Sequence, residues 1–241
     1  MKALILAAGL GTRLRPITDT IPKPLVPIDG KPLLAYHFDS LRKYGVNEVL
    51  INTHHLADQI NQFVAEYCKQ FSEFKVKISF EPKLLGSAGT LRANMDFFKG
   101  EENFLVVYGD NLTNINYEKF IDFHLKKGGL ITIACYQEPY PESKGIIVFD
   151  EDKLITQFIE KPKPEQVISH YANAGIYVCN RRVFDYLKIF KVPIIDFGRD
   201  LFPLLLANEK MYAYEMEEFL LDIGTLATYS AANKIINKLT F

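Results

Sequence analysis

The chain has 241 residues, 48% hydrophobic and 24% charged, and its 28 basic and 29 acidic residues give a formal net charge of -1. A chain of this length can bury a large core. Its balanced charge is unlike the basic excess of proteins that bind nucleic acid or membrane surfaces. Three distant cysteines exclude a disulfide framework and a zinc site and are typical of a reducing compartment. No apolar run reaches the roughly 20 residues of a membrane span. We therefore expect a cytoplasmic protein that binds neither nucleic acid nor membrane.

Short apolar runs alternate with amphipathic segments in the first half of the chain. The sequence predicts strands over 2–7, 48–53, 76–80 and 104–108, and helices over 34–44, 60–71 and 90–97. Strands that alternate with helices imply right-handed crossovers and a mainly parallel sheet with helices on both faces. Ligands bind beyond the carboxyl ends of such strands, which singles out the loops after Ala7, Phe80 and Tyr108.

Beyond about residue 128, the strand-like segments follow one another at shorter intervals along the sequence. The sequence predicts closely spaced strands over 130–136, 145–149, 154–160 and 175–179, and helices over 183–187, 200–207 and 226–239. Close spacing favours antiparallel pairing. The expected fold is α/β, a Rossmann-like doubly wound sheet with an added antiparallel lobe on the substrate side. We expect one domain over 1–241, with halves 1–127 and 128–241 and no C-terminal β-helix, because no short-period repeat is present.

A glycine-rich loop, Gly9-Leu10-Gly11-Thr12-Arg13-Leu14-Arg15-Pro16, follows the first strand directly. Glycines allow a tight turn and bring backbone N–H groups close to a phosphate. The dinucleotide-binding fingerprint fails because Leu14 stands where it needs a third glycine, and the Walker A motif fails because Gly30-Lys31 is followed by Pro32. Two glycines alone are equally typical of an ordinary turn. The cations Arg13 and Lys23, the latter in Pro22-Lys23-Pro24, make this loop suited to a triphosphate.

Further motifs follow in order along the chain. They are Leu85-Gly86-Ser87-Ala88-Gly89, Gly109-Asp110-Asn111, Glu160-Lys161-Pro162, Asn173-Ala174-Gly175-Ile176-Tyr177 and Asp222-Ile223-Gly224-Thr225. With the glycine-rich loop and Lys23-Pro24-Leu25-Val26-Pro27, this ordered set resembles the sugar-1-phosphate nucleotidyltransferases over essentially the whole chain. Two departures are mild, since Ala8 replaces a glycine common in that family and Ser87 replaces a threonine. Length and the stretch Asp200–Pro203 ahead of Tyr212–Tyr214 look most like bacterial mannose- or heptose-1-phosphate guanylyltransferases.

The resemblance implies an enzyme that transfers a nucleotidyl group from a nucleoside triphosphate, GTP being favoured, to a sugar 1-phosphate with release of pyrophosphate. Residues 1–127 would bind the nucleotide and 128–241 the sugar phosphate. Two alternatives stay open: a uridylyl- or thymidylyltransferase acting on glucose 1-phosphate or another sugar 1-phosphate, and a non-catalytic regulatory protein that binds nucleotide sugars. The family also includes homo-oligomers.

The same resemblance implies the roles of individual residues. Catalytic roles fall to Arg13, Lys23, Asp110, Lys161 and Asp222, of which Asp110 and Asp222 would bind Mg²⁺. Nucleotide contacts fall to Leu6, Ala8, Gly9, Gly11, Thr12, Arg13, Lys23, Glu81, Gly86, Ser87 and Asp110. Sugar contacts fall to Asn111, Gly145, Glu160, Lys161, Asn173 and Gly175. Without the resemblance, Asp110 could simply form a turn, and Asp222 could cap a helix that starts at Leu226.

Glu81 stands where uridylyl and thymidylyl relatives commonly carry glutamine. A carboxylate offers only hydrogen-bond acceptors. Guanine presents two adjacent donors, N1–H and its 2-amino group, so an ionised Glu81 could accept from both. The alternative is a surface glutamate at a strand end, with the base bound by backbone groups. The carboxylate interpretation predicts a preference for GTP.

Overall fold

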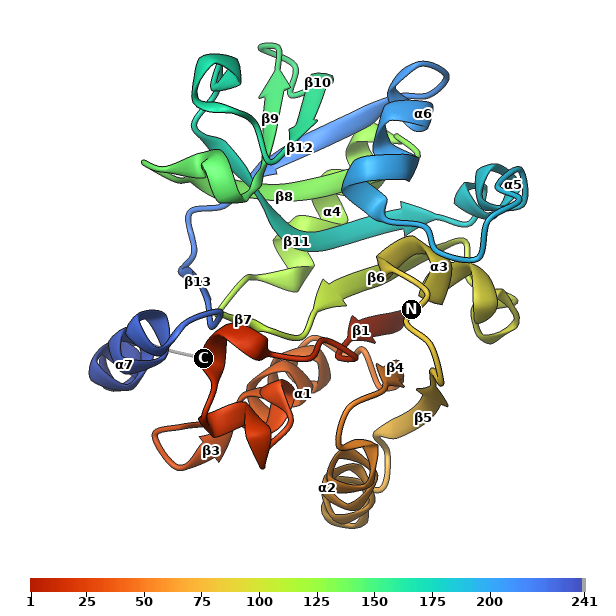
Figure 1. Ribbon diagram of the computed structural model, residues 1–241. Coiled ribbons are helices and arrows are strands. Elements are labelled where there is room, and N and C mark those ends of the chain that lie inside the picture. The colour runs from red at the N-terminus through yellow and green to blue at the C-terminus, as the bar shows by residue number, and fades with distance from the viewer. Residues whose placement is uncertain (240–241) are drawn as a thin grey trace. The chain divides into compact units, whose positions relative to one another are not determined.

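The structure is a computed structural model that describes residues 1–239 (Figure 1). The described chain divides into two units. Unit 1 comprises Met1–Leu84, Val107–Tyr117 and the segment from Glu218 onward. Unit 2 comprises Leu85–Val106 and Glu118–Glu217. Strand β6 (Asn103–Tyr108) begins in unit 2 and ends in unit 1.

Unit 1 is built on three parallel strands, β1 (Lys2–Leu6), β4 (Glu48–Thr53) and β5 (Lys75–Phe80). In register, Leu6 lies opposite Asn52, and Thr53 lies opposite Phe80. The carboxyl ends of the three strands therefore lie level at one edge. The connecting helices are α1 (Leu33–Lys43) and α2 (Ala57–Gln70). These elements confirm the predicted alternation of parallel strands and helices.

The end of the chain packs beside the middle of the chain in unit 1. Strand β7 (Asn111–Thr113) pairs antiparallel with β13 (Leu220–Asp222), and Asp222 lies opposite Asn111. Helix α7 (Leu226–Ile235) follows, and its N-cap is Thr225, whose side chain accepts from the backbone N–H of Thr228. Asp222 is therefore not the cap of this helix, and its carboxylate is available for another role.

A buried apolar cluster fixes the glycine-rich loop to the rest of unit 1. It combines Leu14 from that loop with Ile28, Leu33, Leu112 and Ile223, all fully buried. Ile28 belongs to a short hairpin of β2 (Pro27–Ile28) and β3 (Lys31–Pro32). Four segments that are distant in sequence thus share one core, which holds the loops carrying Arg13, Lys23 and Asp110 in place.

Unit 2 contains mainly antiparallel strands: β8 (Ile131–Gln137), β9 (Gly145–Phe149), β10 (Ile155–Glu160) and β11 (Tyr171–Asn180). Antiparallel pairs join β9 to β10, β8 to β11 and β9 to β11. These pairings confirm the expected antiparallel lobe. A fifth strand, β12 (Met211–Glu215), was not predicted and runs parallel to β8.

Helices complete unit 2. They are α3 (Ser87–Ala93), α4 (Tyr117–Lys127), whose first residue belongs to unit 1, α5 (Val183–Leu187) and α6 (Phe202–Leu206), the last preceded by a π-helical turn over Phe197–Leu201. Helix α4 was not predicted from the sequence. The predicted helix over 90–97 is α3 followed by a 3-10 turn at Met95–Phe98, and the one over 226–239 is α7 followed by a 3-10 turn at Ile236–Lys238.

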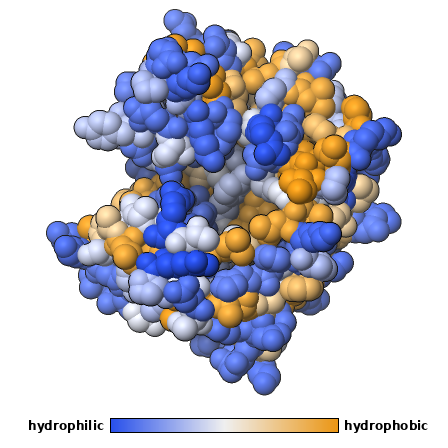
Figure 2. All heavy atoms as spheres, in the orientation of Figure 1, coloured by the Kyte–Doolittle hydropathy of each residue, from blue (hydrophilic) through white to orange (hydrophobic). Residues whose placement is uncertain are grey.

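The surface combines many charged side chains with scattered apolar ones. Figure 2 shows one face on which hydrophilic residues predominate, with hydrophobic residues among them. All three cysteines are free thiols; Cys135 and Cys179 are buried, and Cys68 is half-buried. Within residues 1–239, no helix has both the length and the apolar character needed to cross a membrane.

Candidate functional site

Lys23 joins two aspartates from distant parts of unit 1. Its Nζ lies 2.6 Å from Oδ2 of Asp110 and 3.8 Å from Oδ1 of Asp222. The lysine side chain is almost fully buried, and Pro22 and Pro24 restrict the backbone of the 3-10 turn that carries it. The two carboxylates thus lie close to one ammonium group. A nearly buried ammonium group needs such charge partners, because a buried charge without a partner is strongly destabilising.

Arg13 lies at the border of the same cluster. A Cβ built on Gly224 would lie 3.1 Å from Nη2 of Arg13 and 3.0 Å from Oδ1 of Asp222, so both groups face this glycine. Gly11 makes the approach of the loop possible because its φ is +64° and a Cβ there would lie 3.2 Å from the Cβ of Lys23. Thr18 fastens the loop by donating to the carbonyl oxygen of Gly11 at 2.7 Å.

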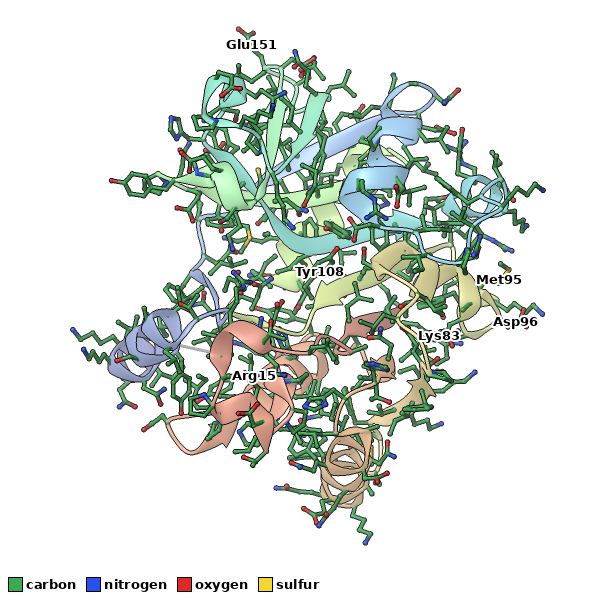
Figure 3. All side chains as sticks on the ribbon, in the orientation of Figure 1. Arg15, Lys83, Met95, Asp96, Tyr108 and Glu151 are labelled. Carbon is green, nitrogen blue, oxygen red and sulfur yellow. The ribbon has the colours of Figure 1, made fainter. Side chains whose placement is uncertain are left out.

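A second glycine places Asp110. Tyr108 ends β6 (Figure 3), and the backbone N–H of Gly109 donates to the carbonyl oxygen of Leu6 at 2.9 Å. A Cβ on Gly109 would lie 2.9 Å from Cγ2 of Ile5. Glycine therefore lets the Asp110 turn lie directly against the end of β1. Arg15, also labelled in Figure 3, pairs instead with Asp19 at 3.1 Å.

His37 supports the Asp110 turn from the interior and was not identified from the sequence. It is 3% exposed and forms a hydrogen bond with the backbone of Asn111. Burial lowers the pKa of His37 to about 4, although the nearby charge of Asp110 and the bond to Asn111 favour protonation. The imidazole is therefore neutral at pH 7 and acts as a packed polar support beneath the turn.

Carboxylate oxygens are the ligands that Mg²⁺ prefers, and the ion usually keeps several waters and phosphate oxygens as its remaining ligands. Asp110 and Asp222 present two such carboxylates to one cationic centre. No group of three or more His, Cys, Asp or Glu side chains that could hold a metal occurs in the part of the chain that the structure describes. The donor set therefore fits an ion that takes few protein ligands and completes its shell with phosphate, rather than a closed structural metal site.

Glu81 lies at the end of β5 and is linked to β1 through Asn52. Asn52 Oδ1 accepts from the backbone N–H of Ala7 at 2.7 Å, and its Nδ2 donates to Oε1 of Glu81 at 3.0 Å. The Ala7 bond fixes the orientation of the amide, so Nδ2 has to face the carboxylate. Glu81 is only 2% exposed, so the alternative of a surface glutamate is wrong. Whether its carboxylate selects the base stays a prediction.

In unit 2, Glu160 ends β10 among glycines. A Cβ on Gly145, its partner in the register with β9, would lie 2.9 Å from Oε2 of Glu160, and one on Gly198 would lie 2.4 Å away. Both glycines therefore leave room for the carboxylate. Burial raises the pKa of Glu160, the charge of Asp196 adds to this, and the charges of Lys161 and Arg199 oppose it.

Lys161 follows Glu160 in an unusual backbone conformation. Its φ is +47°, and its N–H donates to the carbonyl oxygen of Lys144 at 2.9 Å. A left-handed conformation at a residue other than glycine is uncommon and is found at binding sites where the surroundings enforce it. Because of this conformation, the backbone at Lys161 no longer follows the direction of β10, which ends at Glu160.

Asn173 and Gly175 lie at an irregularity of β11, where the register with β8 shifts between Asn173 and Tyr177. Asn173 Oδ1 accepts from the N–H of Gly175 at 2.9 Å, and its Nδ2 donates to the hydroxyl of Tyr177 at the same distance. Gly175 has a φ of +68°. Such bulges redirect side chains and are frequent beside active sites.

Gly86 and Ser87 form the start of α3. A Cβ on Gly86 would lie 2.5 Å from the carbonyl oxygen of Ile195, and Ser87 Oγ donates to Oδ2 of Asp196 at 2.7 Å. Neither Ile195 nor Asp196 was identified from the sequence. The Asp196-Phe197-Gly198 stretch carried a signal, because an aspartate two residues before a glycine is typical of a capped turn.

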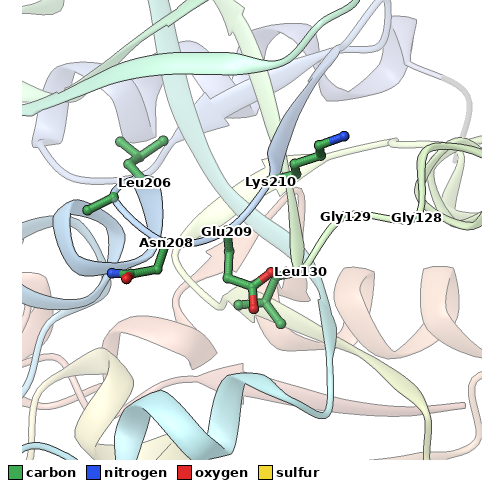
Figure 4. A pocket seen from close by; sticks show the side chains of 8 residues that line it. Gly128, Gly129, Leu130, Leu206, Asn208, Glu209 and Lys210 are labelled. Carbon is green, nitrogen blue, oxygen red and sulfur yellow. The ribbon is translucent and has the colours of Figure 1, made fainter.

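The predicted residues thus fall into two groups. Arg13, Lys23, Asp110 and Asp222 converge in unit 1, and Glu160 lies with Gly145 in unit 2. A cavity of about 520 Å³ elsewhere in unit 2 contains none of the predicted residues. It is lined by Gly128, Gly129, Leu130, Leu206, Ala207, Asn208, Glu209 and Lys210 (Figure 4). In this cavity Glu209 forms an ion pair with Arg182 at 2.9 Å, and the side chain of Lys210 points away from Glu209. We assign this cavity no function.

Known proteins resemble this chain over nearly its whole length. The model of the family described as nucleotidyl transferase matches residues 2–238. A UTP--glucose-1-phosphate uridylyltransferase of Synechocystis is 37% identical over 95% of this chain and 61% of its own length. A mannose-1-phosphate guanyltransferase of Saccharomyces cerevisiae is 32% identical over 93% of this chain and 61% of its own length. The chain therefore spans about 61% of the length of these curated relatives.

Solved structures match over nearly their full length. A Bacillus anthracis protein that carries the designation glucose-1-phosphate thymidylyltransferase has a TM-score of 0.88 and 26% identity, covering 100% of this chain and 97% of that one. HddC from Yersinia pseudotuberculosis, complexed with GMP-PN, has a TM-score of 0.79 and 26% identity, covering 98% and 99%. These matches confirm the α/β fold and the predicted resemblance. The chain belongs to the nucleotidyl transferase family.

Proposed function

We propose that the protein transfers a nucleotidyl group from a nucleoside triphosphate to a sugar 1-phosphate and releases pyrophosphate. The observation that carries this proposal is the convergence of Lys23, Asp110 and Asp222, with Arg13 at their border, from four distant segments of unit 1. Two polyanions repel each other as they approach, so an enzyme that joins them needs positioned cations. This cluster supplies those cations.

Each group of residues has a role in this reaction. Asp110 and Asp222 would hold Mg²⁺, which neutralises charge on the phosphates when it is bound. Lys23 and Arg13 then bind the triphosphate, and Lys161 binds the phosphate of the sugar. Glu160 accepts hydrogen bonds from sugar hydroxyls, and Asn173 with the backbone at Gly145 and Gly175 completes the sugar pocket.

For the base and the sugar we propose GTP with mannose 1-phosphate or a heptose 1-phosphate. Support comes from Glu81, whose carboxylate can accept from the two donors of guanine, and from the relatives named mannose-1-phosphate guanyltransferase. The uridylyl alternative is favoured by a different observation, since a relative named UTP--glucose-1-phosphate uridylyltransferase shows the higher identity of 37%. A non-catalytic regulatory protein is disfavoured because Arg13, Lys23, Asp110, Lys161 and Asp222 are all intact.

A pyrophosphate-release assay tests the proposal directly. It crosses GTP, UTP, dTTP and ATP with mannose, glucose and manno-heptose 1-phosphates in the presence of Mg²⁺. We expect release with GTP and mannose 1-phosphate or manno-heptose 1-phosphate. Release only with UTP or dTTP and glucose 1-phosphate would support the alternative enzyme, and no release with any pair would refute the proposed activity.

A further inference from the structure

The segment Pro193–Asp200 lies along the start of α3 within unit 2. The N–H of Ile195 donates to the carbonyl oxygen of Leu85 at 2.9 Å. The carbonyl oxygen of Ile195 accepts from the N–H groups of Ala88 and Gly89 at 3.0 and 2.9 Å. These bonds satisfy amides at the first turn of α3, which have no partner inside the helix. The loop over 85–89 and this segment therefore move as one piece of backbone.

Asp196 connects that piece to the turn that follows it. Its Oδ2 accepts from the Ser87 hydroxyl at 2.7 Å, and the same hydroxyl accepts from the N–H of Phe197 at 3.0 Å. The other oxygen, Oδ1, accepts from the N–H groups of Gly198 and Arg199 at 3.0 and 3.3 Å. One carboxylate thus bonds α3 through one oxygen and the turn through the other.

The turn that contains Gly198 lies against Glu160. A Cβ on Gly198 would lie 2.4 Å from Oε2 and 3.2 Å from Cδ of Glu160, so no side chain fits between them. The charge of Asp196 also acts on Glu160, because it is one cause of the raised pKa of that carboxyl group after burial. A displacement of Asp196 would therefore change both the position of the turn and the charge that Glu160 experiences.

We propose that Asp196 is a positioning residue that couples the loop over 85–89 to Glu160. The inference rests on the proposed function, in which Gly86 and Ser87 face the nucleotide and Glu160 faces the sugar. Contact of the nucleotide with the loop over 85–89 acts on Asp196 through Ser87, Asp196 holds the Gly198 turn, and the turn positions Glu160 for the sugar phosphate. Coupling of this kind is reciprocal, so each substrate strengthens the binding of the other by the same factor.

Calorimetric titrations measure this coupling factor. Mannose 1-phosphate is titrated into the protein with and without the α,β-methylene analogue of GTP, whose α,β bridge cannot be broken by nucleotidyl transfer, and glucose 1-phosphate with the α,β-methylene analogue of UTP forms a second pair. For wild type we expect the nucleotide analogue to tighten sugar-phosphate binding by about fivefold or more. In Asp196→Asn the factor should fall close to one, with weaker binding of the sugar phosphate alone.

Two further variants make the test specific. Ser87→Ala removes the two hydrogen bonds of the Ser87 hydroxyl, to Asp196 and from the N–H of Phe197, and leaves the bonds of Asp196 to Gly198 and Arg199. It should therefore lose coupling even if Asp196→Asn does not fold. Asp185→Asn removes an exposed carboxylate on α5 that pairs with Lys188 at 3.3 Å, and it should retain the wild-type factor. A second readout is the titration of the Glu160 carboxyl group by NMR, whose pKa should fall in Asp196→Asn and not in Asp185→Asn.

The outcomes separate the coupling from the proposed function. If wild type binds neither pair, the proposed function fails and the coupling fails with it. If wild type binds a pair and Ser87→Ala and Asp196→Asn keep the full coupling factor, the proposed function stands and the role of Asp196 is overturned. The same holds if wild type binds both substrates with a factor of one.

Discussion

At the residue scale, the charge cluster of unit 1 consists of residues that are far apart in the sequence. Lys23, Asp110 and Asp222 are brought together because the chain returns to pair β13 with β7. The resemblance to the sugar-1-phosphate nucleotidyltransferases singled out these three residues, because an aspartate in Gly109-Asp110-Asn111 is by itself typical of a turn. The role of His37 beneath them was not predictable, because His37 lies on the buried face of α1 and its sequence context is typical of a core position.

The first prediction concerns the two aspartates. Asp110→Asn and Asp222→Asn should each lower turnover by about a hundredfold or more, because each removes one negative charge from a site that stabilises developing charge by several kcal/mol. Asparagine is close in size to aspartate, so the circular dichroism spectrum should stay unchanged. Turnover is measured at saturating substrates over a range of Mg²⁺ concentrations, with Asp58→Asn on α2 as the control. A folded Asp110→Asn protein with normal turnover at ordinary Mg²⁺ contradicts the assignment.

The second prediction concerns Glu81 and the base. In Glu81→Gln the amide Nδ2 of Asn52 still needs an acceptor, so the introduced amide must place its oxygen toward Asn52 and its NH₂ where Oε2 was. A donor then replaces an acceptor, and an unmatched buried group costs about 1–3 kcal/mol. Wild type should prefer GTP to UTP by roughly tenfold or more, and the variant should shift toward UTP. Initial rates with each nucleotide check this, and equal rates in wild type would refute the carboxylate readout of guanine.

At the element scale, periodicity predicted most of the fold, and its failures have physical causes. Helix α4 was missed because one of its inward positions is His124, a buried polar residue that interrupts the apolar repeat. Strand β12 was missed because its pairing partner β8 lies far back in the sequence, so no local turn signal marks it. Local patterns predict elements, whereas the bulge at Asn173 arises from the pairing of β11 with β8, and the bond of Asp196 to Ser87 joins residues 109 positions apart.

The third prediction concerns Gly86, which lies before α3 and against Ile195. Gly86 and Gly45 have nearly the same φ, +75° and +74°, but a Cβ on Gly86 would lie 2.5 Å from a backbone oxygen, whereas Gly45 has no atom within 4 Å. Gly45→Ala should therefore show only left-handed strain of about 1–2 kcal/mol. Gly86→Ala should lose about 1–3 kcal/mol more, because the backbone has to shift away from Ile195 and because φ +75° with ψ 162° is a conformation essentially restricted to glycine. Urea unfolding measures both free energies, and equal losses would mean that the contact with Ile195 is not tight.

At the scale of the whole molecule, buried histidines link stability to pH in both units. His37 lies in unit 1 and His124 in unit 2, and burial lowers the pKa of each to about 4. His124 makes hydrogen bonds on both ring nitrogens, to Thr132 Oγ1 at 2.8 Å and to Asn103 Oδ1 at 3.1 Å. Because the Asn103 oxygen can only accept, Nε2 carries the proton and Nδ1 accepts from the threonine hydroxyl. The neutral ring is thus fully hydrogen-bonded.

The fourth prediction follows from this neutral ring. An unfolded histidine binds a proton near pH 6.5, whereas folded His124 does so only near pH 4, so the unfolded state holds the extra proton between these values. The contribution of His124 to stability is therefore complete above about pH 6.5 and falls by roughly 3 kcal/mol as the pH drops toward 4.

His124→Gln removes this titration but can still donate to Asn103. Urea unfolding at pH 7.5 measures the packing loss of the variant, and the further change down to pH 4.5 measures the proton effect. Wild type should lose more stability over that interval than His124→Gln, by about 1.4 kcal/mol per pH unit where one proton is taken up. Parallel acid curves for the two proteins would show that folded His124 takes up its proton like the unfolded chain.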